Sequence, residues 1–210
     1  MLTFKVLAAL LDYPGSATIA ALPEMRAILA GEGKLDGLAV DRLFAFMYKL
    51  EQGDLLDQQA AWVDLFDRTR SLSLHLFEHV HGDSRDRGQA MVDLAALYAD
   101  RGLTIDASEL PDYLPLFLEF LSLIPESEAR QLLGETVHVV EALAERLAGR
   151  GSDHAILLSA LASLAEAPAP AQPLATPDTD GDLDAAWQEE EIRFAAGAMP
   201  SACGAAGTGT

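Results

Sequence analysis

Apolar residues recur along this chain at the spacing of an α-helix, at positions such as i, i+1, i+4 and i+7. Sets of this kind are Leu43, Phe44, Met47 and Leu50; Leu55, Trp62, Leu65 and Phe66; Met91, Leu94, Ala95 and Tyr98; and Val137, Val140, Ala144 and Leu147. Turn residues interrupt the pattern at YPG, GEG, EQGD and GRGSD, and no strand-like alternation is present. We therefore predict an all-α protein, a single helical bundle domain of roughly eight to ten helices at typical helix lengths.

The helical pattern stops at Glu166, where the composition changes. The domain is predicted over 1–166, followed by a Pro-rich linker over 167–181 that cannot bury enough surface to offset its ordering entropy. Residues 182–194 form a short acidic and aromatic segment that could become helical, and 195–210 are predicted to be a disordered, low-complexity tail. This acidic end of the chain is either a solubilising tail or a tethered motif that docks on the domain or on a partner.

Charge and composition narrow the class of protein. The 210 residues carry 33 acidic and 14 basic side chains, a net charge of −19, which disfavours nucleic acid and favours cationic partners. The single cysteine, Cys203, excludes an internal disulfide and a cysteine-based metal site. The apolar run Val6–Leu11 is shorter than a signal-peptide core, and no stretch approaches the ~20 apolar residues of a membrane span. These features predict a soluble, cytoplasmic protein.

One short stretch matches a pattern of zinc peptidases. His75, Glu78 and His79 form H-x-x-E-H, and on a helix the two histidines would share one face, with the glutamate as a general base. Such a five-residue pattern often arises by chance. The alternatives are that one or two histidines are hydrogen-bonded in the interior while the others are solvated, or that they form a polar recognition patch.

A second dense stretch covers residues 107–128. Asp112 is placed to cap a helix that begins at Tyr113, and Pro115 falls in its first turn. The helix is apolar nearly all round, which predicts burial, and Glu119 would then be a buried carboxylate that needs a partner. Either Glu119 pairs with an arginine of 85–101 or caps a neighbouring helix, or it borders a groove together with Asp112 and meets a basic, amphipathic peptide.

Two sequence blocks carry a family resemblance. SLSLHLFEHVHGDSRDRGQAMVDL (71–94) and ELPDYLPLFLEFL (109–121) resemble the delta-type assembly chaperones of membrane-bound respiratory nitrate reductases, which belong to a wider family of molybdoenzyme-specific chaperones. LLDYP (10–14) and WQEEEIRF (187–194) support the resemblance, which runs from residue 1 to about residue 194.

The resemblance implies a helical bundle without catalytic activity and without a cofactor of its own. Such a protein binds the N-terminal segment of the apo alpha (catalytic) subunit in the cytoplasm while molybdenum cofactor and an iron–sulfur cluster are inserted. It also delays membrane docking of the alpha–beta complex and is absent from the finished enzyme. The oligomeric state, monomer or domain-swapped dimer, stays open.

The matching blocks imply a set of groove residues that contact the partner peptide: His75, Phe77, His79, Asp112, Tyr113, Leu116, Glu119 and Phe120. No catalytic or metal-binding residue is expected under this interpretation. Two alternatives remain. One is a proofreading chaperone for a molybdoenzyme exported by the twin-arginine route, and the other, from a different class, is a zinc-dependent hydrolase that uses His75, Glu78 and His79.

Overall fold

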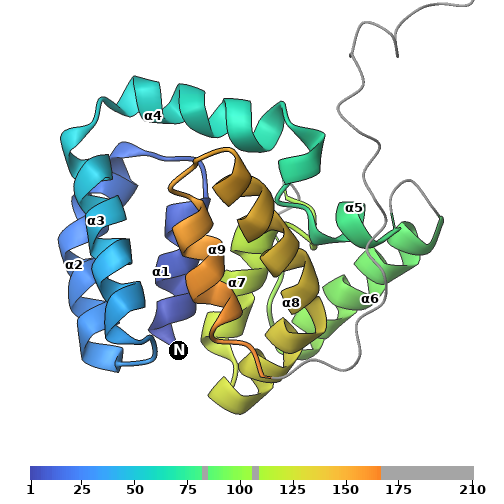
Figure 1. Ribbon diagram of the computed structural model, residues 1–210. Coiled ribbons are helices and arrows are strands. Elements are labelled where there is room, and N and C mark those ends of the chain that lie inside the picture. Colours follow the sequence, from blue (N-terminus) through green and yellow to red (C-terminus); the bar gives the residue numbers. More distant parts are fainter. Residues whose placement is uncertain (82–84, 106–108, 167–210) are drawn as a thin grey trace, which may run out of the picture. The chain divides into compact units, whose positions relative to one another are not determined.

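The computed structural model describes residues 1–81, 85–105 and 109–166, all of which lie in one compact unit (Figure 1). Nine α-helices are formed by these residues: α1 (Leu2–Leu11), α2 (Ser16–Glu32), α3 (Gly37–Gln52), α4 (Leu55–Trp62), α5 (Leu76–His81), α6 (Arg85–Asp100), α7 (Leu114–Leu123), α8 (Glu126–Gly149) and α9 (Ala155–Ala162). The predicted all-α fold is confirmed. The segments predicted over 167–181, 182–194 and 195–210 lie outside the described residues.

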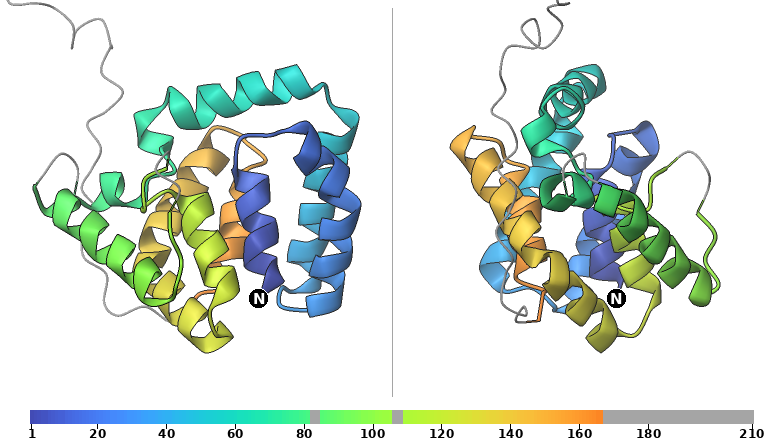
Figure 2. Two further views of the ribbon diagram at one scale, coloured as in Figure 1. Left: turned by 180° about the vertical axis from the view of Figure 1, so that it is seen from behind. Right: turned by 90° about the vertical axis from the view of Figure 1, so that its right-hand side faces the viewer.

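The N-terminal helix α1 lies at the centre of the bundle, where it packs against α2, α7 and α9 (Figures 1 and 2). Its apolar character follows from this position, since Phe4, Leu7 and Leu11 are fully buried. The side chain of Glu32, from the end of α2, accepts hydrogen bonds from the backbone N–H groups of Leu2 and Thr3. These bonds satisfy donors that the first turn of a helix leaves unpaired. None of the helices in the described part is long and apolar enough to cross a membrane.

The connections between helices use the turn residues that the sequence places there. Gly33 ends α2 with a φ of +60°, a left-handed conformation in which glycine avoids the steric cost of a Cβ atom. Asp36 caps α3 by accepting from the N–H of Ala39, and Asp54 caps α4 by accepting from the N–H groups of Leu56 and Asp57.

Helix α4 runs across the ends of α1, α2 and α3 (Figures 1 and 2) and buries none of its residues fully. Side chains attach it to backbone carbonyls instead: Gln58 Nε2 donates to Leu50 at 2.7 Å, Gln59 Nε2 to Pro14 at 2.8 Å, and Trp62 Nε1 to Leu11 at 2.8 Å. A π-helical turn, η1 (Val63–Asp67), follows directly.

Candidate functional site

The two sequence blocks meet at an isolated antiparallel bridge between His75 and Tyr113. The N–H of Leu76 donates to the carbonyl of Asp112 at 3.0 Å, and the N–H of Leu114 donates to the carbonyl of Leu74 at 2.8 Å. The bridge therefore fixes the start of α5 against the start of α7, and it brings residues from both blocks into one site.

Asp112 is fully buried beneath this bridge. Its Oδ2 accepts from the backbone N–H of Phe77 at 3.1 Å, its Oδ1 accepts from Nδ1 of His75 at 3.2 Å, and Nη2 of Arg87 lies 3.8 Å from Oδ2. The predicted cap of the helix containing Pro115 is therefore wrong. That helix starts at Leu114 with Tyr113 as its uncapped N-cap, whereas Asp112 satisfies the first turn of α5. Pro115 does lie in the first turn of α7, as predicted.

His75 is partly exposed, with 28% of its side chain accessible. The hydrogen bond to Asp112 raises the pKa of the His75 imidazole above its usual value, against the opposing effect of burial. The ring lies 5.4 Å from that of Tyr113, centroid to centroid.

His79 is 3% exposed and lies in the interior. Its Nε2 donates to the carbonyl of Ser73 at 2.8 Å, which leaves Nδ1 to accept from Nη1 of Arg146 at 3.4 Å. Burial lowers the pKa of the His79 imidazole, so the neutral form is favoured. The interpretation of this residue as a hydrogen-bonded interior histidine is confirmed.

This geometry does not form the zinc site that H-x-x-E-H would give. Helix α5 begins at Leu76, so His75 precedes it and the two histidines do not form an i, i+4 pair on one helix. Glu78 accepts from Arg87 at 3.1 Å and so has its own ion-pair partner. Across the described residues, no group of three histidine, cysteine or carboxylate side chains is arranged to hold a metal ion.

A cavity of about 370 Å³, here called the bridge cavity, opens beside the bridge. Its lining residues come from the end of α4, from η1, η2 (Arg70–Leu72) and α5, and from the residues before α5 and α7: Trp62, Phe66, Asp67, Arg68, Arg70, Ser73, Leu74, His75, Glu78 and Tyr113. Two of the eight predicted groove residues, His75 and Tyr113, line it. The bridge cavity combines aromatic surface with charges of both signs, which suits a ligand that has both apolar and polar groups.

The other predicted groove residues lie elsewhere. Phe120 is buried with its ring 4.6 Å from that of Tyr98, and Phe77 is half-buried against His81. Leu116 is half-buried, whereas Glu119 is exposed and forms no ion pair within the described parts of the chain. The predicted burial of Glu119 is therefore wrong.

The helical period explains the exposure of Glu119. Positions 116, 119 and 123 fall on one face of α7, and Leu123 on that face is 66% exposed. The opposite side of α7 packs against α1 and α8. Two of the candidate partners in 85–101 pair with other acids, Arg87 with Glu78 and Arg101 with Glu128.

Helical periodicity did not predict the aromatic wall of the site. Trp62 and Phe66 were predicted only as the buried stripe of a helix, but they form part of an aromatic row on α4 and η1. In this row Tyr13 contacts Trp62, Trp62 contacts Phe66, and Phe66 contacts His154, with centroid distances of 5.3–5.5 Å. A tryptophan within an otherwise weakly apolar helix was the available signal, since tryptophan is enriched at binding interfaces.

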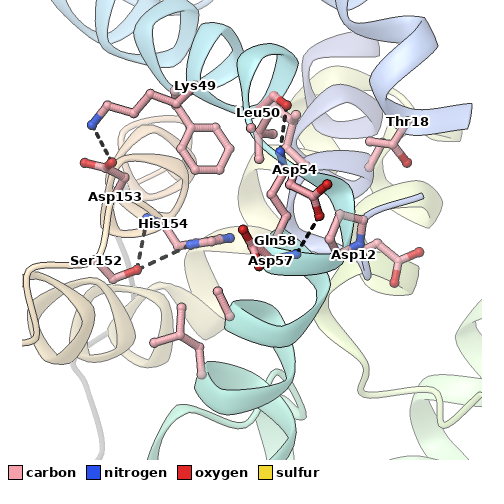
Figure 3. Close-up of a pocket in the computed structure, with 17 residues that line it drawn as sticks. Asp12, Thr18, Lys49, Leu50, Asp54, Asp57, Gln58, Ser152, Asp153 and His154 are labelled. Atoms are coloured by element: carbon pink, nitrogen blue, oxygen red, sulfur yellow. Dashed lines mark hydrogen bonds and ion pairs between the residues drawn. The ribbon is translucent and has the colours of Figure 1, made fainter. Parts of the chain in front are cut away.

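A second cavity, of about 410 Å³ and here called the α4 cavity, is lined in part by residues of α4 (Figure 3). Ala61 and Leu65 face it, whereas Trp62 and Phe66 face the bridge cavity. The arm formed by α4 and η1 thus separates two hollows.

The fold resembles that of a solved crystal structure. The crystal structure of a protein from Archaeoglobus fulgidus assigned to redox enzyme maturation aligns over 76% of this chain and 89% of that chain, with a TM-score of 0.53 and 24% sequence identity. The nitrate reductase delta subunit family matches residues 34–158.

Curated relatives give the family at higher identity. The nitrate reductase molybdenum cofactor assembly chaperone NarJ of Escherichia coli K12 is 41% identical over 92% of this chain and 85% of its own. The probable assembly chaperone NarW of the same strain is 40% identical over 92% of this chain and 84% of its own. The chain therefore belongs to the nitrate reductase delta subunit family, a family of cofactor-assembly chaperones rather than enzymes.

Proposed function

We propose that this chain is a dedicated chaperone that binds the N-terminal segment of the apo alpha subunit of a nitrate reductase in the cytoplasm. In doing so it would hold the subunit while molybdenum cofactor and an iron–sulfur cluster are inserted. It would also delay membrane docking of the alpha–beta complex and would leave before the enzyme is complete. The names of its relatives support a role in cofactor assembly. The net charge of −19 supports a cationic client segment, because complementary charge speeds and orients association.

One observation carries the choice of site: the two blocks that define the resemblance are joined at the His75–Tyr113 bridge, and the bridge cavity opens beside it. Trp62, Phe66 and Tyr113 offer aromatic surface to an apolar anchor of the client. An amphipathic helix would dock its apolar face here, as helices do in grooves of other recognition domains.

The buried members of the predicted groove support the site from beneath. Asp112 holds His75 through its carboxylate, and His79 ties α5 to Ser73 and Arg146. These two residues would act as positioning residues, and direct client contact would come from the accessible lining. Leu116 and Glu119 would contribute only if the client extends along α7.

The experiment is a calorimetric titration of the full chain with a synthetic peptide of the alpha-subunit N-terminal segment from the same organism. Trp62→Ala removes aromatic surface from the bridge cavity, and we expect it to weaken binding by about 2 kcal/mol, roughly 30-fold in Kd. The matched control is Tyr48→Ala on α3, because Tyr48 is 61% exposed and lines neither cavity.

Equal affinities of the Trp62→Ala and Tyr48→Ala variants, with both helical by circular dichroism, would exclude the bridge cavity as the peptide site. Binding that is lost when a twin-arginine pair in the client segment is changed to twin lysine would favour the proofreading role instead.

A further inference from the structure

The α4 cavity combines an apolar lining with an acidic rim (Figure 3). Its apolar lining includes Ala9, Leu10, Pro14, Phe46, Leu50 and Leu65. Four carboxylates line it as well: Asp12, Asp54, Asp57 and Asp153. In Figure 3, Asp153 lies at one end of the view and Asp12 at the other, with Asp57 between them.

Positive charge in the lining balances only part of this acidity. Lys49 contacts Asp153 at 2.6 Å, and its side chain is 66% exposed. His154 is the other basic side chain, and burial between Phe46 and Phe66 lowers the pKa of its imidazole to about 4. At neutral pH the histidine is therefore uncharged, and four carboxylates face one ammonium group.

Two acceptors on α4 have no hydrogen-bond partner among the described residues, and one of them, the carboxylate of Asp57, is exposed to a ligand. Asp57 lies in the first turn of α4, is exposed, and forms no side-chain hydrogen bond or ion pair within the described residues. Gln58 is half-buried, and its Nε2 is used by Leu50, but its Oε1 is buried without a hydrogen-bond partner. Buried acceptors of this kind are unfavourable until a donor reaches them. Asp54 Oδ1 already accepts two hydrogen bonds from backbone N–H groups, because it caps α4.

The α4 cavity and the bridge cavity lie on opposite sides of the same arm and have no lining residue in common. Successive residues of the arm face opposite sides, Ala61 and Leu65 toward the α4 cavity and Trp62 and Phe66 toward the bridge cavity. Asp12, on the rim of the α4 cavity, accepts from the hydroxyl of Tyr113 in the bridge cavity at 2.9 Å. The rims of the two cavities therefore meet at the contact between Asp12 and Tyr113.

We propose that the α4 cavity is a second subsite of the client-binding surface, and that it binds an arginine side chain of the peptide whose apolar anchor occupies the bridge cavity. This inference rests on the proposed function. A guanidinium presents five donors and suits several acceptors at once, which Asp57 and the neighbouring carboxylates of the rim provide. The methylene stem of arginine covers apolar surface, as the lining of the cavity requires.

The test is a double-mutant cycle between protein and peptide. The peptide is the alpha-subunit N-terminal segment, together with a series in which each arginine in turn is replaced by citrulline, its neutral isostere. The protein variants are Asp57→Asn and, as a matched control, Asp41→Asn on α3. Asp41 is exposed and lines neither cavity, so both variants change the net charge equally. Circular dichroism checks that each variant keeps its helicity.

We expect Asp57→Asn to weaken binding of the unmodified peptide about fivefold relative to Asp41→Asn. We also expect one citrulline position to weaken binding to the unmodified protein about fivefold and to have little further effect on Asp57→Asn, because the two groups interact.

Three results would overturn the inference. The first is equal affinity of the two protein variants, and the second is independent, additive losses at every citrulline position. The third is tight binding by a client segment that contains no arginine. If the unmodified protein fails to bind the unmodified peptide at all, the proposed function itself falls, and the inference falls with it.

Discussion

Replacing Asp112 by asparagine tests how the site is held together. The substitution keeps the shape of the side chain but removes its charge. One oxygen remains to accept from the N–H of Phe77, while the other position becomes an NH2 group that faces Nδ1 of His75. The attraction to Arg87, 3.8 Å away, is lost as well.

The magnitude follows from the type of contact. Hydrogen bonds to charged groups contribute roughly 1.5–3 kcal/mol each, and here the neutral amide can still replace part of them. We therefore expect Asp112→Asn to lower the free energy of unfolding by about 2 kcal/mol. The matched control is Asp93→Asn on α6, where the carboxylate is exposed and accepts only from Gln89, and there we expect less than about 0.5 kcal/mol.

The pH dependence gives this prediction a second readout. Because Asp112 raises the pKa of His75 in the folded state, the contribution of the pair to stability is complete below the ordinary histidine pKa. This contribution to stability is lost as the pH rises through the raised pKa of His75 in the folded protein. The effect of Asp112→Asn should therefore be larger at pH 6 than at pH 8.

Urea unfolding followed by circular dichroism at both pH values measures these differences. If Asp112→Asn costs less than the Asp93→Asn control, or costs the same at pH 6 and pH 8, the assignment of Asp112 as the buried anchor of His75 and α5 is incorrect.

Two further predictions concern packing. Burial lowers the pKa of His154 in the folded protein to about 4, so the imidazole takes up a proton in the unfolded protein first as the pH falls. This residue should therefore lower the free energy of unfolding by about 2 kcal/mol between pH 7 and pH 5. His154→Phe should flatten that part of a urea-unfolding pH profile, and an unchanged slope would contradict the prediction. A Cβ atom on Gly134 would lie 2.6 Å from the carbonyl oxygen of Glu166, so Gly134→Ala should lower the free energy of unfolding by about 2 kcal/mol. Gly31 has open space where its Cβ would lie, so Gly31→Ala should raise the free energy of unfolding by roughly a few tenths of a kcal/mol. Thermal melts compare the two, and a stable Gly134→Ala variant would show that the chain does not cross α8 so closely at Glu166.

Helical periodicity predicted the elements well because it reports local geometry. Val137, Val140, Ala144 and Leu147 all fall on the buried face of α8, as their spacing requires. The prediction failed where burial depends on neighbouring helices. Glu119 belongs to a helix that is apolar nearly all round, and only the arrangement of α1 and α8 around α7 determines which of its faces is left exposed.

The site itself could not be derived from spacing. Asp112 and His75 are 37 positions apart, and nothing in the local sequence shows that one caps the helix after the other. The H-x-x-E-H pattern failed for the opposite reason, because it assumes a continuous helix and α5 begins one residue too late. The resemblance identified the two blocks, but their junction at the His75–Tyr113 bridge emerges only from the fold.

The proposed function requires that this chain hold an apo alpha subunit at the bridge cavity while the cofactor is inserted. The most direct measurement is the molybdenum content of the nitrate reductase alpha subunit purified from cells that lack the chain and are complemented with Trp62→Ala or Tyr48→Ala. We predict a metal-poor subunit with Trp62→Ala and normal loading with Tyr48→Ala. Full molybdenum loading in cells that contain no copy of the chain would contradict the account.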